Sequence, residues 1–169
     1  MKNSTKDLIE EIIELDDCPF TMFEVHGFFI GLILSRTEPD VKQDKITKFL
    51  DLTANSQPVT NKLMNLANVE LSENYLEIYP ESDYFIKDNV DIATALSEWT
   101  YYFLISYQNT SKSNDDIREN EILDIFDEIS QINQKYQTND KSSPKENFND
   151  INSFIIKSVL YLFHRSSNE

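Results

Sequence analysis

The chain has 169 residues, of which 40% are apolar, and its 30 acidic and 15 basic residues leave a formal net charge of −15. This length and apolar fraction are enough for one compact core. The charge argues against direct binding to nucleic acid, because the summed field repels phosphate groups. Cys18 is the only cysteine. An intrachain disulfide and a cysteine-rich zinc site are therefore excluded.

Residues that form tight turns are scarce in this sequence. It contains only two glycines and five prolines, and every proline falls between apolar-periodic segments rather than inside one. Sandwiches and barrels need many turns, whereas proline between segments is typical of helices. We therefore expect an all-α fold, a multihelical bundle of about seven helices in two packed lobes.

The first half of the chain predicts four helices, because apolar residues recur every three or four positions. They cover residues 5–15, 22–35, 41–53 and 59–69. The first is indicated by Leu8, Ile9, Ile12, Ile13 and Leu15. Thr21 and Glu24 form a capping-box pattern before the second, which is apolar nearly all round and so predicted to be buried. Phe49 and Leu52 are expected to face inward from the third, and residues 71–80 to form an extended connection.

The second half predicts three helices, over residues 83–107, over 115–133, and from a capping Ser143 and Pro144 to the C-terminal end. Polar loops are expected at 108–114 and 134–143. His164 and Arg165 fall in the last turn of the final helix, where positive charge favours the helix dipole. We divide the chain into an N-terminal lobe, residues 1–79, and a C-terminal lobe, residues 80–169, that share an interface.

Gly27 and Gly31 are the only glycines, and they lie four residues apart in the second predicted helix. This spacing places both on one face of the helix. A glycine inside a helix costs roughly 0.5–1 kcal/mol relative to alanine. Two such costs in one helix predict that another backbone approaches this helix closely. We expect this close contact to be the one around which the N-terminal lobe is built.

Two stretches resemble the bacterial YgfB-like family, which includes the YecA proteins. The first is Phe23-Glu24-Val25-His26-Gly27-Phe28-Phe29-Ile30-Gly31-Leu32, and the second is Ala95-Leu96-Ser97-Glu98-Trp99. The resemblance implies an all-helical cytoplasmic protein whose relatives have no established catalytic activity.

The chain also departs from the family's pattern. Thr100 stands where the family often has cysteine, and Tyr102 and Ser106 stand where it often has glycines. These departures put close backbone packing on the long helix in doubt. The C-terminal Cys/His segment of the YecA branch is absent, so the resemblance implies no zinc.

Glu24 and His26 are the obvious candidates for chemistry. On a helix, residues two apart point about 200° from each other, so these two cannot act together as an acid–base dyad. Glu98 and Glu121 are possible partners elsewhere in the chain. We predict no catalytic, cofactor-binding or metal-binding residue, and we expect His26 to bond to a backbone carbonyl or a carboxylate. Around Trp99, the aromatic residues fit either core packing or an exposed binding surface.

The sequence favours a non-enzymatic cytoplasmic adaptor or regulator that binds a protein through an acidic surface, and charge complementarity favours a basic partner. The polar start of the chain indicates no signal peptide, and no apolar run is long enough to cross a membrane. The acidic surface could instead serve only solubility. Two alternatives remain. One is a small metal-dependent or hydrolytic enzyme that uses His26 with Glu24 or Glu98. The other is a structural homo-oligomer, such as a homodimer, in which the Gly27/Gly31 helix or the aromatic helix around Trp99 contributes to the interface.

Overall fold

The computed structural model describes residues 4–35, 37–78, 89–107, 116–132 and 145–167. Helices dominate these residues and no strand occurs among them, so the predicted all-α fold is confirmed. The described helices are α1 (Thr5–Asp16), α2 (Met22–Leu34), α3 (Pro39–Leu50), the short 3-10 helix η1 (Ala54–Ser56), α4 (Gln57–Ser72), α5 (Asn89–Tyr107), α6 (Ile117–Ser130) and α8 (Lys145–Ser167).

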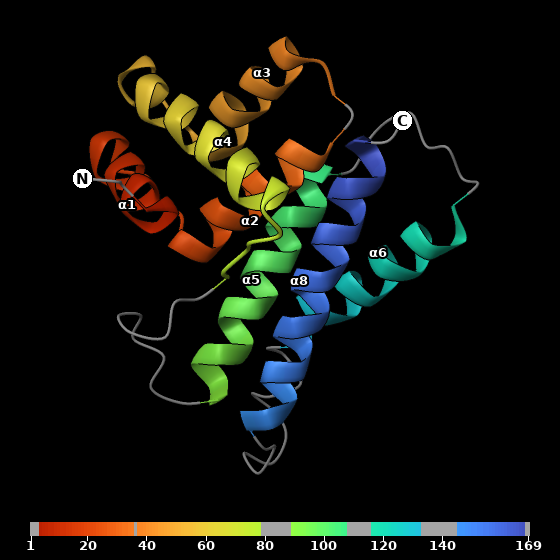
Figure 1. Ribbon diagram of the computed structural model, residues 1–169. Coiled ribbons are helices and arrows are strands. Elements are labelled where there is room, and N and C mark those ends of the chain that lie inside the picture. The colour runs from red at the N-terminus through yellow and green to blue at the C-terminus, as the bar shows by residue number, and fades with distance from the viewer. Residues whose placement is uncertain (1–3, 36, 79–88, 108–115, 133–144, 168–169) are drawn as a thin grey trace.

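The helices form two groups that meet along α2 and α5. Figure 1 shows α1, α3 and α4 gathered on one side of α2, and α5, α6 and α8 on the other. The α2–α5 contact is the most extensive between any two described helices. A helix that is apolar on all sides can pack against neighbours on all sides, and α2 does so from Val25 to Leu32.

Two clusters of buried side chains make up the core, and α2 contributes to both. Phe28 and Phe29 belong to the cluster shared with α1, α3 and α4. Ile30 and Leu34 belong to the cluster that unites α5, α6 and α8, together with Leu71 at the end of α4. The core therefore crosses the boundary that we placed at residue 79.

Several helix boundaries differ from the sequence prediction, most clearly those of α3 and α4. α3 starts at Pro39, which suits a first helical position, and ends at Leu50, because Asp51 adopts the left-handed conformation with φ of 53°. α4 continues to Ser72, three residues beyond the expected end at Val69, and thereby buries Leu71 completely. The predicted extended connection is thus wrong at its first two residues.

Several side chains face solvent where the apolar pattern placed them inward. Leu15 and Phe49 are each 47% exposed, and Ile125 is 39% exposed. Phe49 still packs one side of its ring against Phe28, with centroids 5.9 Å apart. Leu52 is buried as expected, but from the loop that follows α3.

Some predicted features lie outside the described residues. They are the start of the fifth helix at 83, the polar loops at 108–114 and 134–143, and the capping pair Ser143 and Pro144. α6 begins at Ile117, with Asp116 as its capping residue. In the part of the chain that the structure describes, no helix combines the length and hydropathy that crossing a membrane requires.

Candidate functional site

The two stretches that carry the family resemblance meet at the α2–α5 interface. A Cβ atom at Gly27 would lie 2.1 Å from the carbonyl oxygen of Trp99, far inside contact distance. A Cβ atom at Gly31 would lie 2.4 Å from the carbonyl oxygen of Phe103 and 2.2 Å from Oγ of Ser106. The predicted close backbone approach is therefore real, and only glycine fits at either position.

The neighbour at this contact differs from the expectation. We placed the contact inside the N-terminal lobe, but the neighbouring backbone belongs to α5, in the second half of the chain. The doubt about close packing on the long helix was also wrong. Ser106 and Thr100 are small enough to lie fully buried there, so the helices approach closely without further glycines.

His26 lies within this interface and is only 4% exposed. The indole Nε1 of Trp99, itself fully buried, donates a hydrogen bond of 3.2 Å to Nδ1 of His26. Because an indole can only donate, Nδ1 is the acceptor and the proton of the neutral ring lies on Nε2. Burial lowers the pKa of His26 to about 4, which keeps the ring neutral near pH 7. The partner is thus an indole, and not the carbonyl or carboxylate that we expected.

Glu24 and Glu98 meet at Thr21, the capping residue of α2. Thr21 and Glu24 form the predicted capping box: the Thr21 hydroxyl accepts from the Glu24 amide at 3.3 Å, and the Thr21 amide donates to the Glu24 carboxylate at 2.7 Å. The same hydroxyl donates to Oε2 of Glu98 at 2.8 Å, and this ties α5 to the start of α2. Burial is the main cause that raises the pKa of Glu98 above its ordinary value.

These contacts do not assemble an acid–base pair. Among the described residues, His26 makes no hydrogen bond to Glu24 or Glu98, and its Nδ1 accepts from Trp99 instead. The same residues contain no group of three histidine, cysteine, aspartate or glutamate side chains placed to hold a metal ion. Thus a packing and capping unit joins α2 to α5, and it consists of Glu24, His26, Gly27, Gly31, Glu98 and Trp99.

The aromatic residues of α5 divide between core and surface. Trp99, Phe103 and Tyr107 stack along one face, with centroids 5.4 Å and 5.3 Å apart, and the first two are fully buried. Tyr101 is 51% exposed on the outer face. Core packing therefore accounts for Trp99 and Phe103.

A pocket of about 140 Å³ opens beside His26, between α1, the start of α2, the end of α4 and the segment from Tyr75 to Ile78. Its lining includes Thr5, Lys6, His26, Glu70, Tyr75 and Glu77. Burial raises the pKa of Glu70, and the hydrogen bond to Glu77 raises the pKa of Tyr75 to about 12. Sequence reasoning missed this pocket, because its walls come from four separate segments that share no local motif.

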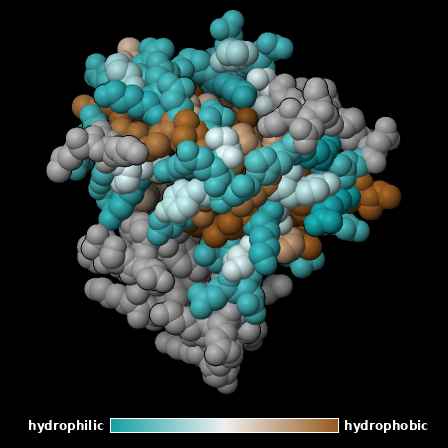
Figure 2. Space-filling model, in the orientation of Figure 1, coloured by the Kyte–Doolittle hydropathy of each residue, from teal (hydrophilic) through white to brown (hydrophobic). Residues whose placement is uncertain are grey.

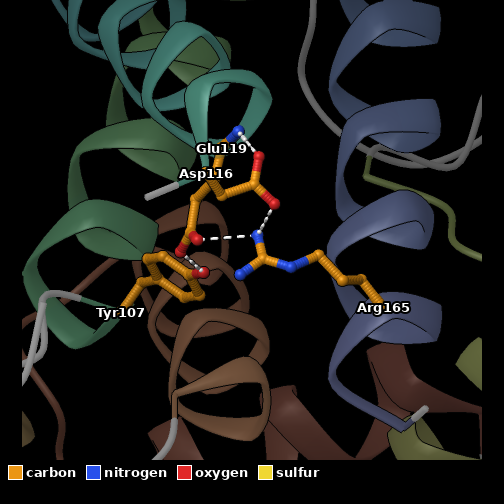
Figure 3. A network of polar contacts seen from close by, with 4 residues as sticks. All are labelled: Tyr107, Asp116, Glu119 and Arg165. Atoms are coloured by element: carbon orange, nitrogen blue, oxygen red, sulfur yellow. Dashed lines mark hydrogen bonds and ion pairs between the residues drawn. The ribbon is translucent and has the colours of Figure 1, made fainter. Parts of the chain in front are cut away.

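A second polar cluster fastens the end of α8 to the start of α6 (Figure 3). The guanidinium of Arg165 lies 2.7 Å from the carboxylates of both Asp116 and Glu119. The hydroxyl of Tyr107, at the end of α5, donates to the other oxygen of Glu119. The capping pattern at Asp116 and Glu119 is visible in the sequence, but nothing local indicates that Arg165 would reach it.

Exposed carboxylates gather on two helices at different sides of the molecule. α1 exposes Glu10, Glu11 and Glu14, and α6 exposes Glu121, Asp124, Asp127 and Glu128. α6 also exposes Ile117, at 75%, and Ile125. Figure 2 shows apolar surface beside hydrophilic side chains at the right-hand edge, where α6 lies in Figure 1.

Comparison of the chain with family models, with curated proteins and with solved structures gave no match. The resemblance to the YgfB-like proteins therefore stays a prediction that rests on its two motifs.

Proposed function

We propose that this protein is a non-enzymatic adaptor or regulator that binds a basic protein partner through the outer face of α6. The observation that carries the proposal is the composition of that face. Ile117, Glu121, Asp124 and Glu128 follow each other at spacings of three or four residues, so they share one side of the helix, with Ile125 beside them.

Among the described residues, the carboxylates of this face are not paired with a cation. No ion pair within the described residues involves Glu121, Asp124 or Glu128. Arg118, the only basic residue of α6, lies over the ring of Tyr161 on α8, 4.6 Å from its centroid. A partner's lysine and arginine residues would supply the missing positive charge and be steered toward it.

The opposite side of α6 holds the helix firmly in place. Ile122, Phe126 and Ile129 are buried in the core, and the Arg165 cluster fixes the first turn. A rigid face loses little entropy on binding, and its exposed isoleucines can add apolar contact to the charge attraction. α1 offers acidic residues too, but Lys6 already lies 4.0 Å from Glu10 and only Leu15 is an exposed large apolar residue there.

Affinity capture from a native extract tests the proposal with two matched variants. Each removes the same number of charges from one acidic face. They are Glu121→Gln/Asp124→Asn/Glu128→Gln on α6 and Glu10→Gln/Glu11→Gln/Glu14→Gln on α1. We expect a basic protein to be captured at low salt and released at high salt, because ions screen the attraction. The α6 variant should no longer capture this protein, and the α1 variant should still capture it.

A further variant, Ile117→Ser, separates the contribution of charge attraction from the contribution of apolar contact. It should weaken capture at every salt concentration, because it removes apolar contact and leaves the charge unchanged. Capture that is independent of salt, or that both triple variants reduce equally, would count against α6 as the binding face.

A further inference from the structure

His26 lines the pocket between α1, α2 and α4 with one ring nitrogen still available. The residue is only 4% exposed, yet it lines the pocket. Its Nδ1 is occupied by the Trp99 indole, so Nε2 carries the proton. No hydrogen bond from Nε2 occurs within the described residues. A buried N–H group is normally paired with an acceptor, and the bond at the other nitrogen makes this one a stronger donor. We therefore expect a ligand in the pocket to supply the acceptor.

Two carboxylates give the pocket a negative charge that can attract a cation. Glu70 and Glu77 both line it. The Thr5 hydroxyl donates to Glu70 at 2.8 Å, and the Tyr75 hydroxyl donates to Glu77 at 2.5 Å. These are neutral donors, so they orient the carboxylates without cancelling their charge. Lys6 also lines the pocket but lies close to Glu10 on its own helix.

The size and walls of the pocket limit what it can accept. Its volume of about 140 Å³ is below the roughly 300–1,000 Å³ of pockets that hold drug-sized ligands. Ile9, Met22 and Ile78 contribute apolar wall. The fitting ligand is therefore a molecule of only a few heavy atoms, with a short carbon skeleton between its polar groups.

We propose that this pocket binds a small organic ammonium ion that also carries a hydroxyl or carbonyl oxygen. Its ammonium group bonds to Glu70 and Glu77, and its oxygen accepts from Nε2 of His26. Because His26 is neutral, it does not repel the cation. This proposal is independent of the protein-binding face, since α6 contributes nothing to the pocket.

A nuclear magnetic resonance titration tests this proposal with three small probes. Ethanolamine carries both groups, ethylamine lacks the oxygen, and ethylene glycol lacks the positive charge. Trp99 is the only tryptophan, so its indole N–H gives a single resonance that reports on the hydrogen bond to His26. We expect ethanolamine to shift this resonance and the His26 ring signals saturably, and the other two probes to bind at least about fivefold more weakly.

Two isosteric variants complete the test. Glu70→Gln keeps the acceptor for Thr5 but removes the charge, and should weaken ethanolamine binding about tenfold. Glu38→Gln removes the same charge from an exposed side chain before α3, which does not line the pocket, and should leave binding unchanged. Circular dichroism confirms that both variants are folded. The proposal is overturned if ethanolamine moves neither reporter, if the three probes act alike, or if the two variants bind ethanolamine equally.

Discussion

Gly27 shows most clearly what a single residue decides in this fold. Gly27→Ala would gain roughly 0.5–1 kcal/mol of helix propensity. It would also place a Cβ atom 2.1 Å from the Trp99 carbonyl oxygen, which is backbone and cannot rotate away. Overpacking of this kind costs about 1–3 kcal/mol, and we expect the cost to prevail. Thermal unfolding should show a melting temperature several degrees below that of the wild type.

Asn61→Ala on the exposed side of α4 is the matched control for this substitution. This substitution also raises helix propensity, but its side chain faces solvent and not a neighbouring backbone. It should therefore leave the melting temperature unchanged or raise it slightly. If Gly27→Ala behaved like this control, the close contact between α2 and α5 would be refuted.

The buried ring of His26 makes stability depend on pH. Its pKa is about 4 in the folded chain, against an ordinary value of 6.5. Between these values the unfolded chain binds a proton that the folded chain does not. Stability is therefore lost as the pH falls from about 6.5 toward about 4, and the residue contributes no pH dependence above that window. Between pH 7 and pH 4.5 the free energy of unfolding should fall by about 2–3 kcal/mol through this residue.

Urea unfolding of wild type and His26→Gln at both pH values isolates this contribution. A glutamine side chain can still accept from the Trp99 indole but does not titrate in this range. The carboxylates make the same contribution to the pH dependence of unfolding in both proteins, so this contribution cancels when the two are compared. We expect the variant to lose less stability on acidification, and equal losses in the two proteins would contradict a neutral buried His26.

Among the helices, the junction of α6 with α8 depends on Arg165. Its side chain is 18% exposed, and it separates the carboxylates of Asp116 and Glu119. Arg165→Gln removes the cation and leaves two like charges facing each other at the start of α6. We expect the melting temperature to fall by about 2–4 °C. The same substitution at Lys48, whose ion pair with Asp44 is mostly exposed, should change it by less than about 1 °C.

Amide hydrogen exchange adds a local readout at this junction. In Arg165→Gln, protection should fall first in the opening turn of α6, because that turn loses its partner on α8. Two outcomes would mean that the Arg165 cluster does not fasten α6 to α8. One is a uniform loss of amide protection over the whole chain, and the other is an equal loss of stability in Lys48→Gln.

At the scale of the whole molecule, the net charge of −15 opposes folding through self-repulsion. Added salt shortens the range of this repulsion to about 8 Å at physiological ionic strength. The melting temperature should therefore rise by several degrees when sodium chloride is raised from low to physiological concentration. Potassium chloride should act equally, because screening depends on ionic strength. A melting temperature that stays constant or falls as salt is added would show that repulsion between the exposed carboxylates does not destabilise the folded protein.

Helix type and approximate position follow from local spacing in this chain. The apolar positions of α1, α2 and α6 recur at the helical period, and the capping box at Thr21 marks where α2 begins. Helix ends were less predictable. The left-handed backbone at Asp51 and the extra turn that buries Leu71 depend on the neighbours that those residues meet.

The sequence by itself determined that the protein is all-helical, that α2 is buried on all sides, and that something must approach Gly27 and Gly31. Each of these properties is encoded within a few neighbouring residues. Only the tertiary structure decided that the approaching backbone is α5, that the partner of His26 is Trp99, and that Glu70 and Glu77 flank the same pocket. The physical reason is distance along the chain: His26 and Trp99 are 73 residues apart, and no local spacing specifies which buried surfaces will meet.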